Sequence, residues 1–208
     1  MNKYGMELIG TFFLVLTIGM TAIAGGQGVI APLAIGSILM VMVYAGGHIS
    51  GGHYNPAVTL GVWMRGRCST ADVAPYMVFQ VIGALLAAFV VKYLTPGLPV
   101  HTRNLAAGPE LLAEFLFTFA LVFVVLNSAT SKDNNGNSFY GVAIGFTVLA
   151  GAFAVGGIAS AAFNPAVAVG ISTMGLASWS RIWIYLVANF LGGAAAAVAF
   201  RLLCPDDK

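Results

Sequence analysis

Hydrophobic residues fill this chain in long stretches that polar positions rarely interrupt. A helix needs roughly 20 apolar residues to cross a hydrocarbon layer about 30 Å thick. Six stretches approach or exceed that length. The pattern therefore predicts an all-α membrane protein with six transmembrane helices, at residues 5–24, 30–49, 73–95, 109–130, 139–157 and 181–203.

Two further apolar stretches are too short to cross a membrane. Residues 55–63 lie between the second and third predicted spans, and residues 164–173 lie between the fifth and sixth. Both are too hydrophobic for ordinary loops. Broken helices are tolerated at membrane depth where protein or a water-filled cavity surrounds them. We therefore predict two re-entrant half-helices.

The composition supports a membrane protein and excludes several other classes. Of the 208 residues, 59% are hydrophobic and 8% are charged, whereas soluble domains are about a quarter charged. The net charge of +2 is too small to indicate nucleic-acid binding. Cys68 and Cys204 provide no disulfide framework. Near the N-terminus, Lys3 and Glu7 flank no small-residue cleavage site, so we expect a retained first span and no signal peptide.

The lysines and arginines predict the orientation of the chain. Cytoplasmic loops carry an excess of Lys and Arg. With the N-terminus inside, the cytoplasmic side holds Lys3, Arg65, Arg67, Lys132, Arg201 and Lys208, and the outer side holds Lys92, Arg103 and Arg181. Both termini are therefore expected in the cytoplasm.

The two short stretches begin with the same tetrapeptide. Asn55-Pro56-Ala57-Val58 returns 109 positions later as Asn164-Pro165-Ala166-Val167. Further matches in nearly the same register are Ala34-Ile35-Gly36 with Ala143-Ile144-Gly145, Gln80 with Asn189, Gly83 with Gly192, and Glu7-x-x-x-Thr11-Phe12 with Glu114-x-x-x-Thr118-Phe119. Such a series indicates a duplication. Because each half holds three spans, we predict one membrane domain built from two inverted repeats, residues 1–100 and 101–208.

Each Asn-Pro-Ala motif has the sequence of a helix start. Asn is a favoured N-cap, and Pro suits the first helical turn. In an inverted pair, both half-helices point their N-termini, the positive ends of their dipoles, at the centre of the membrane. Asn55 and Asn164 can then donate hydrogen bonds to a passing solute, while the positive potential repels cations and opposes proton conduction. Inverted repeats with broken helices place the permeation site at their interface.

The run GHISGGHYNPAVT at residues 47–59 resembles the first signature of the aquaporin, or major intrinsic protein, family. The second motif and the six-span layout also match, so the resemblance covers nearly the whole chain. It implies a right-handed helical bundle in the lipid bilayer and a homotetramer with one pore per subunit. It further implies passive conduction of water or small neutral solutes without a cofactor, in a bacterial inner (plasma) membrane.

Glu7 and Glu114 are the carboxylates that we place within spans. An intramembrane carboxylate is costly and suggests a function. The resemblance implies that both brace the re-entrant loops by hydrogen bonds, and a proton relay is the alternative. His53 is expected either to line the cytoplasmic part of the pore or to brace its loop, and His48 to serve packing or loop bracing.

The residue after the second motif departs from the family pattern. Most members have an Arg there, which narrows and charges the outer constriction, and this chain has Val167. Alignment with the family pattern places Ile35, Ala152 and Ala161 at the other three constriction positions. Water-selective members carry an aromatic residue, a His, a Thr or Cys and the Arg. Glycerol facilitators keep the Arg beside two aromatic residues and follow it with an Asp, where this chain has Ala168.

Four aliphatic residues predict a wide outer filter without side-chain donors. Each polar group left unpaired costs about 1–3 kcal/mol in proteins, so larger or partly apolar neutral solutes gain relative to a narrow water filter. We predict a channel for water and for solutes like glycerol and urea. An Arg-free filter also resembles that of bacterial aquaglyceroporin variants associated with arsenic detoxification, which makes arsenous acid and methylated arsenicals candidate solutes.

A replacement cation is a separate hypothesis. The outer loop at residues 101–104 holds Arg103, which either folds into the vestibule above the filter or remains a solvated loop charge. An Arg at a pore mouth is a plausible selector of solutes.

Two other functions are alternatives to a channel with broad solute selectivity. One is a mainly water-selective aquaporin with an altered filter. The other is a proton-coupled transporter, which needs titratable groups that paired Asn residues and an aliphatic filter do not supply. The sequence shows no nucleophile–base arrangement, metal-spaced His/Cys cluster or phosphate loop, so no enzyme is expected.

Overall fold

The computed structural model describes residues 1–24 and 30–207, and within these ranges the regular structure is helical. The helices are α1 Asn2–Ile23, α2 Ile30–Ser50, α3 Pro56–Met64, α4 Thr70–Leu94, α5 Ala107–Val125, α6 Tyr140–Val155, α7 Pro165–Met174 and α8 Ile182–Leu203. A π-helical turn, Leu126–Thr130, continues α5, and a 3-10 turn, Trp179–Arg181, precedes α8. Apart from the end of the fourth predicted span, 109–130, which α5 reaches only with its π-helical turn, each predicted segment agrees with its helix to within three residues.

Within the described residues, five helical segments are long and apolar enough to cross a membrane. They are α1, α2, α4, α5 with its π-helical turn, and α8 with its 3-10 turn. Helix α6 has 16 residues, which at about 1.5 Å per residue extend roughly 24 Å. The predicted span 139–157 therefore overestimates this helix at its C-terminal end. The apolar sequence continues after α6 as a turn, in which the Gly156 N–H still donates to the Ala152 carbonyl.

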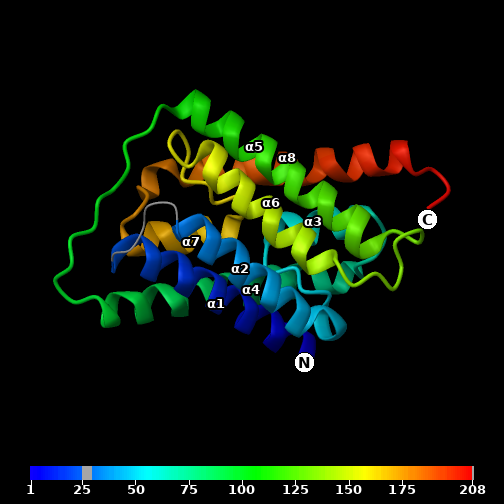
Figure 1. Ribbon diagram of the computed structural model, residues 1–208, viewed down its shortest axis with the longest axis horizontal. Helices are drawn as coiled ribbons and strands as arrows, with labels where there is room; N and C mark the ends of the chain where they lie inside the picture. Colours follow the sequence, from blue (N-terminus) through cyan, green and yellow to red (C-terminus); the bar gives the residue numbers. More distant parts are fainter. Residues whose placement is uncertain (25–29, 208) are drawn as a thin grey trace.

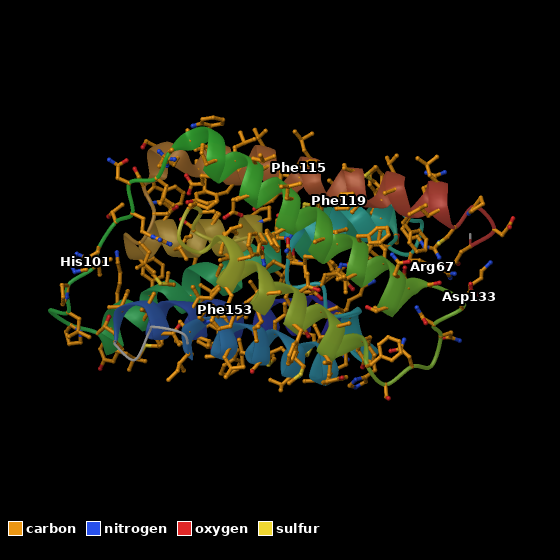
Figure 2. The ribbon with its side chains drawn as sticks, turned by 45° about the horizontal axis from the view of Figure 1, so that its top comes forward. Arg67, His101, Phe115, Phe119, Asp133 and Phe153 are labelled. Atoms are coloured by element: carbon orange, nitrogen blue, oxygen red, sulfur yellow. The ribbon has the colours of Figure 1, made fainter. Side chains whose placement is uncertain are left out.

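The helices of the two repeats pack in equivalent pairs. Helix α1 packs along α4, and α5 packs along α8. Helices α2 and α6 pack against each other, and the short helices α3 and α7 lie within the bundle (Figure 1). Phe115 and Phe119 of α5 and Phe153 of α6 carry aromatic side chains along the second half (Figure 2).

Gly83 and Gly192 permit the two close helix crossings. A Cβ atom on Gly83 would lie 2.4 Å from the Leu8 carbonyl oxygen, and one on Gly192 would lie 2.7 Å from the Phe115 carbonyl oxygen. Both are backbone contacts that cannot shift independently of a helix. Small residues at such crossings allow the close backbone approach typical of membrane helices. The crossing of α1 with α4 and that of α5 with α8 are therefore both close backbone approaches at a glycine.

The two ends of the bundle differ in what they carry. Arg67 and Asp133 lie at one end, and His101 lies at the opposite end (Figure 2). Both chain termini contact the Arg67 end, since Lys3 pairs with Asp72 and Asp207 accepts a hydrogen bond from the Lys132 N–H. The segment between α4 and α5 crosses the His101 end (Figure 1). Of the basic residues predicted on the cytoplasmic side, Lys3, Arg67 and Lys132 thus lie at one end, and Lys208 lies outside the described residues.

Candidate functional site

Each short helix begins at its Asn-Pro-Ala motif, for the reason that the sequence suggested. Asn55 and Asn164 are N-caps with extended backbone, and a Pro occupies the first turn of each helix. Asn55 Oδ1 accepts the Ala57 N–H at 2.8 Å, and Asn164 Oδ1 accepts the Ala166 N–H at 2.9 Å. The caps satisfy backbone donors that an open helix end leaves unpaired.

The two motifs also hold each other. Asn55 Nδ2 donates to the Phe163 carbonyl at 2.8 Å, and Asn164 Nδ2 donates to the Tyr54 carbonyl at 2.8 Å. Each amide nitrogen carries two N–H groups, so one remains to donate to a ligand. The reciprocal bonds bring the N-terminal ends of α3 and α7 together, and with them the positive ends of two helix dipoles.

A buried carboxylate supports the loop before the first motif. Glu7 Oε1 accepts the Ser50 hydroxyl at 2.6 Å and the His53 N–H at 2.9 Å. Glu7 Oε2 accepts the Tyr54 N–H at 2.6 Å and Gln80 Nε2 at 2.7 Å. These contacts join α1 and α4 to the loop between α2 and α3.

Glu114 makes the equivalent contacts in the second half. Its two oxygens accept the Ala162 N–H at 2.9 Å and the Phe163 N–H at 2.7 Å, and Oε2 also accepts Asn189 Nδ2 at 3.1 Å. The supported backbone is strained, because Tyr54, Ala161 and Phe163 have φ angles of 49°, 53° and 48°. Such left-handed conformations cost about 1–3 kcal/mol each in residues other than glycine. The carboxylates hold the backbone in these conformations.

A narrow cavity of about 20 Å³ lies between the two motifs, and a single water molecule requires about 10–15 Å³. Asn55 and Asn164 line it together with Ile35, Ala161 and Val167, three of the four predicted filter residues. In the described lining, α6 contributes Val148, one turn before Ala152. The role of Ala152 in the filter therefore stays a prediction.

A second cavity, of about 940 Å³, opens at the end of the bundle that carries Arg67. Its lining includes His48, Cys68, Asp72 and Lys132. His53 lines both cavities, and its Nδ1 lies 3.1 Å from the Thr59 hydroxyl. His53 therefore lines two cavities and also contacts α3 through Thr59, and its role in the pore stays a prediction. His48 is exposed at the cavity wall.

A third buried carboxylate, Glu110, was not predicted from the sequence. It lies in the first turn of α5, inside the predicted span 109–130, and its side chain is 1% exposed. Glu110 forms a salt bridge with Arg181, accepts the Tyr185 hydroxyl at 2.7 Å, and contacts the Ser160 hydroxyl at 3.4 Å. The prediction that Glu7 and Glu114 are the carboxylates within the spans is therefore incomplete. Ser160 directly precedes Ala161, so this cluster supports the loop that lines the narrow cavity.

The internal repeat contained a signal for that cluster. Lys3 and Asp72 occupy the positions equivalent to Glu110 and Arg181, and they form a salt bridge of 2.7 Å. The pair is conserved in position between the halves, but its charges are reversed. A search of the repeat for identical residues passes over such a match, whereas a search for complementary charges finds it.

Arg65 links the end of α3 to the C-terminal segment. Its guanidinium is 1% exposed, lies 4.7 Å from the Phe200 ring centre and bonds Asp207 at 2.6 Å. Asp207 also accepts the Lys132 N–H at 3.0 Å. A buried Arg is stable only when it is paired, so Arg65, predicted as a cytoplasmic loop charge, is a structural contact between three segments.

Comparison with known proteins places the chain among transport proteins. The family model described as Major intrinsic protein matches residues 29–200. The chain is 38% identical to Aquaporin NIP1-3 of Oryza sativa subsp. japonica, covering 100% of this chain and 75% of that protein. It is 33% identical to Glycerol uptake facilitator protein-like 6 of Lactiplantibacillus plantarum, covering 100% of both. A solved aquaglyceroporin from Plasmodium falciparum has the same fold, with a TM-score of 0.85 at 20% identity over 98% of this chain and 97% of that one.

Proposed function

Because the chain belongs to the major intrinsic protein family, we propose that it is a passive transmembrane channel for water and small neutral solutes. Members of this family are channels and not enzymes. The observation that carries the proposal is the pair of reciprocal bonds by which Asn55 and Asn164 hold each other's loops around a narrow cavity. A solute at this point meets two amide donors and the positive ends of two half-helices.

Selectivity against charge follows from that arrangement. The helix N-termini of α3 and α7 disfavour a cation between them. A neutral solute accepts hydrogen bonds from the remaining N–H groups of Asn55 and Asn164, which replace part of its hydration. Glu7 and Glu114 are engaged with loop backbone, which favours a bracing role for both over a proton relay.

We further propose that the filter of Ile35, Ala152, Ala161 and Val167 passes glycerol, urea and uncharged metalloid hydroxides such as arsenous acid and methylated arsenicals. The central cavity is narrow, so a solute larger than water requires Ile35 and Val167 to change rotamer. Aliphatic side chains make no hydrogen bonds that would oppose such a change. The named relatives include both an aquaporin and a glycerol uptake facilitator-like protein.

The alternative is a mainly water-selective channel. The cavity volume of about 20 Å³ favours this alternative, because it is just above what one water molecule requires. Flux measurements separate the two proposals.

The direct test is stopped-flow light scattering of proteoliposomes that contain the purified protein. Under a sucrose gradient, we expect faster shrinking than in protein-free liposomes. Under glycerol, urea or arsenous acid gradients, we expect shrinking followed by rapid re-swelling as the solute enters. Re-swelling at the protein-free rate with all three solutes would contradict the broad channel and support the water-selective alternative. Shrinking at the protein-free rate under sucrose would contradict channel function itself.

We also propose that the protein is a homotetramer in a bacterial inner membrane with both termini in the cytoplasm. Six of the nine Lys and Arg residues fall on the side assigned to the termini, as the positive-inside rule requires. Native mass spectrometry of detergent-solubilised protein tests the tetramer, and a dimer or monomer would contradict it.

Cys68 offers a test of sidedness. It lies in the loop after α3 and lines the larger cavity. In a Cys204→Ser background, a membrane-impermeant maleimide should label Cys68 in inside-out vesicles and not in sealed right-side-out vesicles. Burial, and then the nearby charge of Asp72, raise the pKa of the Cys68 thiol. Since the thiolate is the reactive form, labelling should become faster as the pH rises toward that raised pKa. Labelling in sealed right-side-out vesicles would reverse the assigned orientation.

A further inference from the structure

Residues 102 and 103 of the outer segment are tied to the end of the second short helix. The segment crosses the end of the bundle from α4 to α5 (Figure 1). Along it, the Thr102 hydroxyl donates to the Gly175 carbonyl at 2.6 Å, and the Arg103 N–H donates to the Leu176 carbonyl at 3.3 Å. Both carbonyls belong to the turn that ends α7. These contacts fix the position of the Arg103 backbone.

The Arg103 side chain reaches the loop that leads into the second motif. Its Nη1 donates to the Gly156 carbonyl and, at 3.2 Å, to the Ala159 carbonyl. Ala161, two residues further along, lines the central cavity. A guanidinium carries five N–H donors, so donors remain beyond these two bonds. The side chain thus lies on the same loop as a filter residue, and its group is exposed to solvent.

The carboxylates of the described residues are engaged away from Arg103. The seven acidic residues of the chain are Glu7, Asp72, Glu110, Glu114, Asp133, Asp206 and Asp207. Glu7 and Glu114 are engaged with the two loops, and Glu110 forms its salt bridge with Arg181. The aspartates belong to the opposite end, with Asp72 lining the larger cavity and Asp207 bonded to Arg65. Arg103 bonds carbonyls at the C-terminal end of α6 and beside that of α7, where the helix dipoles offset part of its charge but not all of it.

We propose that Arg103 is a specificity-determining residue of the channel, which supplies from the outer segment the cationic group that is absent at Val167. This proposal rests on the proposed function. In it, Arg103 has two roles at the outer mouth of the channel. Its charge repels cations before they reach the half-helices. Its remaining N–H groups donate to the oxygens of neutral solutes, where the aliphatic filter offers no donor.

The test compares three variants with the wild type in proteoliposomes. Arg103→Gln keeps N–H donors and removes the charge, and Arg103→Lys keeps the charge with different donor geometry. Lys92→Gln is the matched control, because Lys92 is an exposed cation near the end of α4 that lines neither cavity. Potassium flux is followed with a potential-sensitive dye, and glycerol flux by re-swelling. A unit charge about 3–6 Å away through a water-like dielectric changes a cation's energy enough for a roughly three- to tenfold effect.

The expected result is that potassium flux rises roughly three- to tenfold in R103Q and stays at the wild-type level in R103K and K92Q. Adding Val167→Arg to R103Q should restore exclusion of potassium. Wild-type potassium flux in R103Q would overturn the inference. An equal rise in R103Q and R103K would also overturn it, since loss of loop anchoring would then be the cause. Failure of the wild type to conduct water or glycerol would contradict the proposed function, whatever the variants do to potassium flux.

Discussion

The Val167→Arg variant is expected to lose glycerol and urea flux by more than tenfold while it retains water flux. Val167 is 2% exposed, lies in the first turn of α7 and lines the narrow cavity. A guanidinium there would occupy space that larger solutes need. A tenfold loss requires only about 1.4 kcal/mol, which lies within the roughly 1–3 kcal/mol that added side-chain volume costs in a close-packed interior.

Val167→Leu is the control that separates size from charge. Leucine adds apolar volume at the same position without donors or charge. Re-swelling and shrinking rates of the three proteins are measured in parallel by stopped flow. If Val167→Leu blocks glycerol as completely as Val167→Arg, pore width alone sets the cut-off. Undiminished glycerol flux in Val167→Arg would show that Val167 does not line the path of the solute.

The Glu114→Ala variant is expected to lose much of its stability. Glu114 is fully buried and accepts two loop N–H groups and the Asn189 amide. Each buried polar group left unpaired costs about 1–3 kcal/mol, and no water replaces the lost partner at membrane depth. The strained φ angles of Ala161 and Phe163 would then be unsupported. A destabilisation on the order of 3–6 kcal/mol is expected.

For a chain of this size, such a loss lowers the apparent Tm by roughly 6 °C or more, which thermal unfolding in detergent can measure. Glu114→Gln is the matched control, because it keeps one carbonyl oxygen and loses one acceptor. Its apparent Tm should fall between those of the wild type and Glu114→Ala. A Glu114→Ala protein with wild-type Tm would show that the loop holds its conformation without the carboxylate.

The parts of the structure that could be predicted from the sequence depend on local or repeated signals. The starts of α3 and α7 follow from the capping preferences of Asn and Pro, and the long helices follow from uninterrupted apolar stretches. Glu7 and Glu114 could be singled out because each begins the same short motif in both halves. The structure places both against the loops that precede the two motifs.

Other parts depend on contacts that sequence spacing does not contain. The end of α6 lies before the predicted end, because an apolar turn has the same hydropathy as an apolar helix. Glu110 stands in the first turn of α5, where an acidic residue is ordinary, and only its approach to Arg181, 71 positions away, shows the salt bridge. The contact of Arg103 with Gly156 and Ala159 likewise joins segments that are distant in the chain. The face that Ala152 presents depends on the rotation of α6, which alignment by pattern does not determine.

The narrow cavity between the two motifs has a consequence for transport kinetics. A cavity of about 20 Å³ has room for about one water molecule, so molecules cannot pass one another there and must move in single file. The ratio of osmotic to diffusive water permeability then equals the number of waters in the file and should exceed one. A glycerol molecule in the same lumen must push that file ahead of it. Water and solute therefore compete for one path, and the osmotic permeability to water should fall as the concentration of a permeant solute rises.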